Sequence, residues 1–168
     1  MGFRRRRPPL ERRADGAIVV GLADQEREVL RNLLAQLRVL VGSASTGPID
    51  ESSPVRRLFP TAYPEDVDRE KEYQELARDG LVEQRLAAIE AVEATLDSDT
   101  IDDERAGTWL RTLNDLRLVL GTRLDVSEEP EAVDPDDPDA ALHAVYDYTG
   151  FLVDRLVQCL AESLPGPG

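Results

Sequence analysis

The chain has 168 residues, a formal net charge of −14 and only 5% aromatic residues. A chain of this length can bury one core, which here must be built from Leu, Val, Ile and Ala because aromatic side chains are scarce. No apolar run is long enough to cross a bilayer and Cys159 is the only cysteine, which excludes a membrane-spanning helix and an intramolecular disulfide. We therefore expect a soluble cytoplasmic protein.

Charge is distributed unevenly along the chain. Residues 1–13 hold six arginines against one glutamate, a charge of +5 that leaves −19 on the remaining 155 residues. An acidic body repels duplex DNA over a Debye length of about 8–10 Å, whereas a short basic arm can reach phosphates. Runs of like charge are usually solvated, so we expect residues 1–9 to form a flexible basic arm. The candidate nucleic-acid contacts in this arm are Arg4, Arg5, Arg6 and Arg7.

A short hairpin is expected to open the folded part. The segments 10–13 and 17–22 flank Asp15-Gly16, a pair typical of two-residue hairpin turns in which both turn positions need positive φ. A helix should follow from Asp24, acting as N-cap, to about Val41, with its leucines at helical spacing. Residues 42–54 have the composition of a loop.

The middle of the chain predicts two further helices separated by a glycine. Residues 55–59 fit one helical turn, and Pro64 suits the first turn of a helix whose residues 67–78 are mostly charged. Gly80 is expected to break or bend this helix, after which residues 81–96 continue with an apolar face.

The helix predicted over residues 103–124 is the most distinctive stretch of the chain. It follows a cap at Ser98 or Thr100, and it holds the only tryptophan, Trp109, on a stripe of leucines. An acidic linker broken by prolines covers residues 126–139, and a last helix is expected over residues 140–164.

These elements together predict the fold class. We expect a mainly α protein, an antiparallel helical bundle of about five helices with a small N-terminal β-hairpin. A single helical domain should span residues 10–164, followed by a disordered tail at residues 165–168. The Trp109 helix and the last helix should lie at the centre of the bundle, with the indole in its interior.

Groups suited to catalysis are scarce in this sequence. His143 is the only histidine and lies beside the acidic linker, so neither a catalytic triad nor a His and Cys metal cluster is supported. The acids of the linker lack the spacing of a calcium-binding loop, and no phosphate-binding glycine motif is present. We therefore expect no enzyme activity, no metal and no cofactor.

Polar residues set among the leucines of the Trp109 helix are the best candidates for a site. Asn114 and Arg117 are one turn apart, and we expect them to pair with acids of the 81–96 helix. Such groups either fix the register of packed helices, the interpretation we favour, or form a docking surface for a partner protein. The partner-binding candidates are Asn114, Arg117, Thr122, Arg123, Arg56 and Arg57.

Cys159 lies within the apolar pattern of the last helix. An isolated cysteine in such a pattern behaves as a small apolar side chain, so we expect a buried structural thiol. The alternatives are a redox-active thiol or a cysteine that bridges a homodimer.

Three motifs carry a resemblance to a known family. The segments L-R-N-L, S-P-V-R-R-L-F-P-x-A-Y and W-L-R-x-L-N-D-L-R-L-V-L-G-T-R-L-D resemble an actinobacterial family of uncharacterised helical proteins. Members of this AosR-like family are described as transcriptional regulators of the oxidative stress response and are often encoded beside the Clp protease adaptor ClpS. The resemblance implies a cytoplasmic, non-enzymatic regulator that acts through protein contacts, with a sigma factor among the partners it suggests.

Two functional hypotheses follow from charge and resemblance. The first is a regulatory or adaptor protein whose acidic body binds a basic protein partner. The alternative is a DNA-binding regulator that uses the arginine-rich arm. A redox switch inside one chain needs two thiols, so this sequence, with Cys159 alone, departs from a sensor that works by an internal disulfide.

Overall fold

The structure is a computed structural model, and it describes residues 8–47, 49–125 and 136–163. The described residues are mainly helical, as the sequence predicted, but they form four α-helices rather than about five. The helices are α1 (Asp24–Ser43), α2 (Val67–Thr95), α3 (Asp103–Arg123) and α4 (Ala140–Ala161), with a 3-10 turn η1 (Arg56–Leu58). A small sheet at the N-terminal end is formed by β1 (Leu10–Arg12), β2 (Ile18–Val20) and β3 (Thr100–Ile101).

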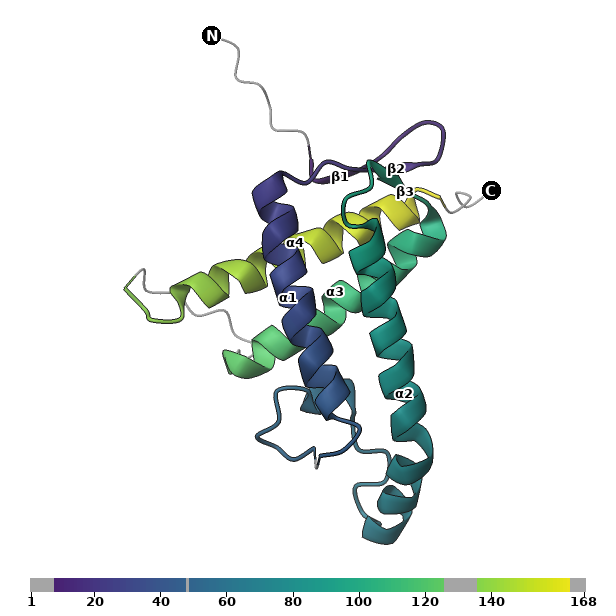
Figure 1. The fold of residues 1–168 in the computed structure, drawn as a ribbon, viewed down its shortest axis with the longest axis vertical. Coiled ribbons are helices and arrows are strands. Elements are labelled where there is room, and N and C mark those ends of the chain that lie inside the picture. Colours follow the sequence, from purple (N-terminus) through teal and green to yellow (C-terminus); the bar gives the residue numbers. More distant parts are fainter. Residues whose placement is uncertain (1–7, 48, 126–135, 164–168) are drawn as a thin grey trace.

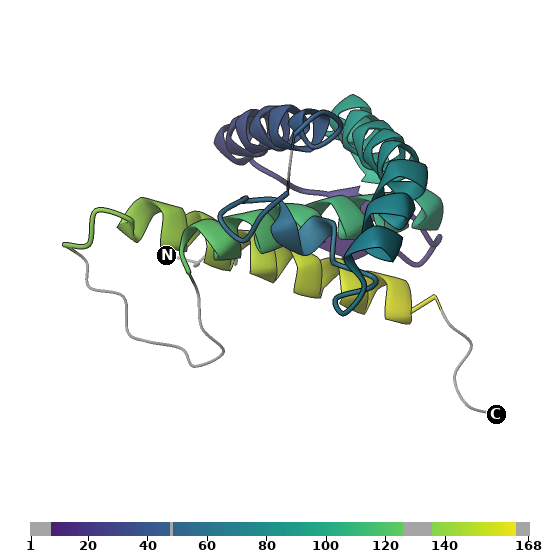
Figure 2. The ribbon, with the colours of Figure 1, turned by 90° about the horizontal axis from the view of Figure 1, so that it is seen from below.

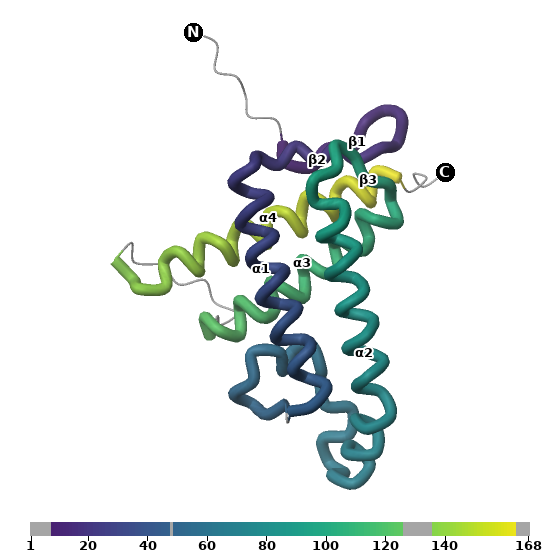
Figure 3. Tube along the Cα trace, viewed as in Figure 1, coloured from purple at the N-terminus to yellow at the C-terminus, as the bar shows by residue number. Residues whose placement is uncertain are grey.

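The helices form two antiparallel pairs that cross each other. The tube in Figure 3 shows α1 and α2 side by side with opposite directions, and α3 and α4 likewise run in opposite directions. The α1–α2 pair crosses over the α3–α4 pair (Figures 1 and 2). Helix α3 is the central element, since it contacts the other three helices and η1, whereas α4 packs mainly on α3 and β1.

Gly80 was predicted to break or bend this helix, and the break is wrong, because residues 67–95 form one helix. A glycine inside a helix costs about 1 kcal/mol relative to alanine, which neighbouring interactions can offset. The Asp66 side chain caps α2 by accepting from the Arg69 amide at 3.0 Å. The buried residues of the second half, Val82, Ile89 and Val92, anchor the helix on the core. The cap and the tertiary packing therefore keep α2 helical across Gly80.

The small sheet contains a strand that the sequence analysis missed. Strand β2 pairs with β1 and, on its other edge, with β3, both antiparallel. Thr100 lies in β3, so it does not cap α3. Asp102 caps it instead, accepting from the Arg105 amide at 2.9 Å. Similarly α1 begins after Ala23, whose amide donates to Glu26, so the predicted cap at Asp24 is wrong.

The hairpin turn also differs from the prediction. Only Gly16 has positive φ in this turn, at 89°, and its amide donates to the Arg13 carbonyl at 3.0 Å. The Arg13 amide in turn donates to the Ala17 carbonyl at 2.8 Å. The hairpin therefore has a three-residue loop, in which a turn is followed by one residue with left-handed backbone conformation. A two-residue turn would need two residues with positive φ.

The tryptophan occupies the interior, as predicted. The side chain of Trp109 is 1% exposed, and its indole nitrogen donates to the Thr95 hydroxyl at 2.8 Å. The surrounding core is mostly aliphatic and includes residues from every helix and from the sheet. The last helix ends at Ala161 rather than 164. The predicted basic arm before Pro8, most of the linker and the tail lie outside the described residues.

Candidate functional site

Arg117 packs on α4 rather than on α2. Its guanidinium carbon lies 5.1 Å from the centre of the Tyr146 ring. Gly150 leaves room for it, because a β-carbon there would come within 3.1 Å of the Arg117 Nε. The predicted pairing of Arg117 with acids of the 81–96 segment is therefore wrong, and Asn114, predicted to pair with the same acids, is exposed. Arg117 joins α3 to α4 by stacking.

The ion pair between α2 and α3 is formed by Arg85 and Asp115. Both side chains are largely buried, and Arg85 also donates to the Leu58 carbonyl at 2.9 Å, which ties η1 to the two helices. Burial raises the pKa of the Asp115 carboxyl, an effect that Arg85 opposes. The polar contacts of α3 with its neighbouring helices thus have structural roles in packing.

Two of the remaining partner-binding candidates make hydrogen bonds to main-chain carbonyls, and the other two are exposed. Thr122 donates to the Leu118 carbonyl one turn earlier at 2.8 Å, and Arg56 donates to the Glu51 carbonyl. Arg57 and Arg123 are exposed, and Arg57 lies near Gly121. A docking role for this set stays a prediction.

Cys159 is 1% exposed and unpaired. Burial raises the pKa of its thiol, which lowers the fraction of reactive thiolate at neutral pH. Its carbonyl accepts from the Arg12 Nε at 2.6 Å, so its backbone helps to join α4 to β1. This environment is that of a structural thiol, and a redox role stays a prediction.

Most arginines among the described residues are turned toward the protein's own acceptors. Main-chain carbonyl oxygens accept from Arg12, Arg27, Arg56, Arg78, Arg85 and Arg155. Ion pairs with acids engage Arg13, Arg31, Arg38 and Arg105. Arginines used in this way stabilise the fold by satisfying main-chain oxygens and by pairing with acids.

The N-terminal half of α2, residues 67–79, carries an acidic stripe that the sequence analysis did not identify. We use this name for Asp68, Glu72, Glu75 and Asp79, whose spacing of i, i+4, i+7 and i+11 places them on one helix face. All four are exposed, and Leu76 beside them is 84% exposed. This half of α2 reaches the lower end of the molecule in Figure 1. The spacing itself was a signal that could have revealed the stripe.

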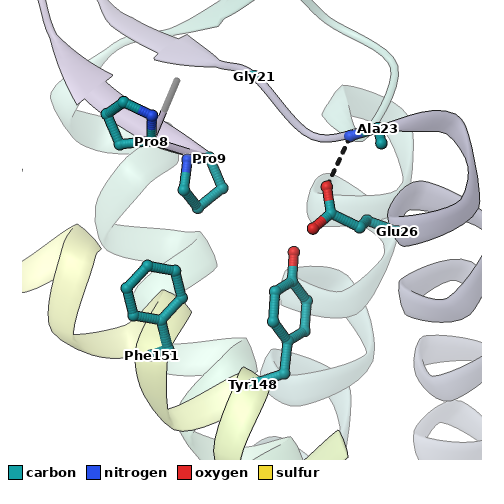
Figure 4. Close-up of a pocket in the computed structure, with 7 residues that line it drawn as sticks. All are labelled: Pro8, Pro9, Gly21, Ala23, Glu26, Tyr148 and Phe151. Carbon is teal, nitrogen blue, oxygen red and sulfur yellow. Dashed lines mark hydrogen bonds between the residues drawn. The ribbon is translucent and has the colours of Figure 1, made fainter. Parts of the chain in front are cut away.

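A hollow of about 630 Å³ lies where the N-terminal segment, the start of α1 and α4 meet. Its walls include Pro8, Pro9, Glu26, Tyr148 and Phe151. Figure 4 shows the Tyr148 hydroxyl directed toward the Glu26 carboxylate, with the Phe151 ring beside it. No sequence pattern indicates this hollow, because its walls come from segments more than a hundred residues apart.

Comparison with known proteins places the chain in a family. Residues 4–160 match the family model of DUF2017, a domain of unknown function. The chain belongs to the DUF2017 family. Relatives named oxidative stress regulator AosR, from Mycobacterium tuberculosis and Mycobacterium bovis, are 29% identical over 177 residues, which cover 84% of this chain and 81% of theirs. The resemblance to an AosR-like actinobacterial family is thereby confirmed. No solved structure matches the chain.

The described part of this DUF2017 chain presents two surfaces suited to binding. Across residues 8–47, 49–125 and 136–163, no three His, Cys, Asp or Glu side chains are grouped so as to hold a metal ion. Within the same ranges no helix combines the length and the apolar character needed to traverse a bilayer. What the geometry provides is an acidic helix face and a hollow with aromatic walls, both suited to binding.

Proposed function

We propose that this DUF2017 chain is a regulatory protein of the oxidative stress response that acts by binding a basic protein partner and not by catalysis. The regulatory part of the proposal is supported by the relatives named oxidative stress regulator AosR, which match over most of both chains. The mode of action is supported by the distribution of charged side chains over the described surface.

The observation that carries the proposal is the acidic stripe on α2. Four carboxylates follow one helix face, and Leu76 is 84% exposed among them. An exposed large apolar residue beside a row of carboxylates suits a partner that presents basic residues around an apolar contact.

Electrostatic association of this kind has a defined signature. Complementary charge raises the association rate and makes affinity fall with ionic strength, since exposed charges are screened over about 8 Å at physiological salt. The first experiment is therefore co-purification of the full chain from its native host at low salt, with reducing and non-reducing gels run in parallel. A basic protein that is retained at low salt and lost at high salt is expected.

The second experiment locates the surface with matched variants of the full chain. The stripe variant carries Asp68→Asn, Glu72→Gln, Glu75→Gln and Asp79→Asn. The control variant removes the same charge from exposed acids of the other three helices, through Glu28→Gln, Glu104→Gln, Asp147→Asn and Asp154→Asn. We expect the stripe variant to lose most of the partner and the control to retain most of it. Equal retention by both variants would contradict the assignment to α2.

The alternative, DNA binding through Arg4, Arg5, Arg6 and Arg7, makes a different prediction. These residues lie outside the described part, and the neighbouring Arg12 and Arg13 are engaged with the Cys159 carbonyl and with Asp15. A mobility shift of duplex DNA that disappears when the four arm arginines are replaced by Gln would favour this alternative. It would count against the protein-contact proposal if no basic protein co-purified.

A further inference from the structure

The hollow beside the N-terminal segment combines groups that suit a cationic ligand. The carboxylate of Glu26 lies on one wall, and the rings of Tyr148 and Phe151 lie on another (Figure 4). Phe151 is 47% exposed, which is unusual for a large aromatic side chain on a helix that packs on the core. No arginine, lysine or histidine is among the described residues that line the hollow. The described walls of the hollow therefore carry a negative charge and no positive charge.

Tyr148 adds a buried hydroxyl group beside Glu26. Its hydroxyl oxygen is shielded from solvent and faces the Glu26 carboxylate (Figure 4), but the two groups are not close enough or well enough aligned for a good hydrogen bond. Burial and the nearby Glu26 carboxylate both raise the pKa of this phenol, so it stays protonated at neutral pH. With its proton directed toward Glu26, the hydroxyl oxygen can still accept a hydrogen bond from a ligand, which would satisfy it better.

A guanidinium group matches both features. It is planar and permanently charged, it donates several hydrogen bonds, and it stacks on aromatic faces. One such group can pair with Glu26, donate to the Tyr148 oxygen and lie against the Phe151 ring. Within the same molecule Arg117 stacks on Tyr146 and Arg85 on Phe59, at 5.1 Å and 5.5 Å from the ring centres. Contacts between an arginine and an aromatic ring thus already occur at two other places in this protein.

The nearest source of arginine is the chain itself. The hollow is bordered by Pro8 and Pro9, and the residues directly before Pro8 are Arg4, Arg5, Arg6 and Arg7. An extended chain advances about 3.3–3.6 Å per residue, so each of these side chains can return to a site that begins at Pro8. A short tether gives an effective concentration in the millimolar range, which makes even a weak site occupied.

We propose that the hollow is a guanidinium-binding site, and that one of the four arginines of the N-terminal segment fills it. The contact holds the basic segment against the start of α1 and against α4. It covers the exposed face of Phe151 and gives the Glu26 carboxylate a cationic partner. This inference is independent of the basic partner proposed above, because it concerns a different surface and a different occupant.

The test uses the full chain and nuclear magnetic resonance. Ring signals of Tyr148 and Phe151 are compared between the natural chain and the variant with Arg4→Gln, Arg5→Gln, Arg6→Gln and Arg7→Gln. We expect both rings to shift on removal of the arginines, and Glu26→Gln to produce similar shifts. The side-chain amide oxygen that Glu26→Gln introduces can still accept from the Ala23 amide, so α1 should begin at the same residue. The control is Asp24→Asn, which removes an acid of the same turn that does not line the hollow.

A small arginine derivative tests whether the hollow binds a guanidinium group, independently of whether the N-terminal arginines occupy it. Nα-acetylarginine amide, added to the variant without the four arginines, should return the ring signals toward their natural positions, and Glu26→Gln in that background should abolish the response. Ring signals that are unchanged on removal of the four arginines would overturn the proposal. It would also be overturned if the probe bound the natural chain as tightly as the variant, because the site would then be empty in the natural chain.

Discussion

Helix α3 and the N-terminal half of α2 show two ways in which a helix is stabilised in this protein. Helix α3 is held by burial, with Trp109 at 1% exposure and contacts to every other helix. Residues 67–79 are held by polar contacts, including the Asp66 cap and a hydrogen bond of 2.6 Å between Gln74 and Glu70. The first region is buried in the core, whereas the second keeps most of its side chains exposed.

Removal of the indole from α3 should cause the largest loss in the free energy of unfolding. Trp109→Ala deletes a fully buried side chain and leaves the Thr95 hydroxyl without its partner, so we expect a loss of about 3–5 kcal/mol in the free energy of unfolding. Denaturant titration by circular dichroism measures this. Trp109→Phe should lose clearly less, and an equal loss in both variants would contradict the cavity as the main cause.

The Arg85–Asp115 pair should give the next largest effect. Arg85→Met leaves a largely buried carboxylate and the Leu58 carbonyl without a donor, so we expect a loss of about 1–3 kcal/mol. The matched control is Arg57→Met, which removes an exposed arginine of the same turn as Leu58 and should change the free energy of unfolding by no more than about 0.5 kcal/mol. Similar losses in the two variants would show that the ion pair is unimportant.

The pH dependence of this pair has a defined sign. Burial raises the pKa of Asp115 in the folded state above its ordinary value of 3.8, so the folded protein binds the proton more tightly than the unfolded chain. The stability contributed by protonation is complete below the unfolded pKa and is lost as pH rises through the folded pKa. In denaturant titrations at several pH values, the natural chain should lose stability relative to Asp115→Asn as pH rises from about 4. A relative gain would contradict a raised pKa.

Gly80 tests whether α2 is truly continuous. A β-carbon at this position would meet no atom within 4 Å, and the residue lies inside a helix. Gly80→Ala should therefore raise the free energy of unfolding by about 0.5–1 kcal/mol. Thermal unfolding measures the gain, with Gly150→Ala as a contrast, because there the β-carbon would press on Arg117. Destabilisation by Gly80→Ala would indicate a bend at this position.

Leu76 should show the smallest effect on folding. Its side chain is 84% exposed, so Leu76→Ala should change the free energy of unfolding by no more than about 0.5 kcal/mol. The same variant should weaken retention of the basic partner in the co-purification assay. A variant that loses stability but keeps the partner would assign Leu76 to the fold rather than to the contact surface.

The sequence predicted what depends on local periodicity. The leucine stripe around Trp109 predicts a helix with one buried face, and these residues are buried on α3. Strand β3 is two residues long and has no periodicity, so nothing in the sequence could reveal it. The break at Gly80 was predicted from local propensity, which distant packing outweighed. Which helix Arg117 would meet depends on the order of the helices in space, and that order is set by the core as a whole.

A partner that binds the acidic stripe of α2 should leave α3 unchanged. Hydrogen–deuterium exchange of the full chain, with and without the co-purified basic partner, tests this directly. The account predicts slower exchange in residues 67–79 when the partner is bound, with no change in residues 109–120. Protection confined to Asn114, Arg117 and Arg123, with none in residues 67–79, would contradict it.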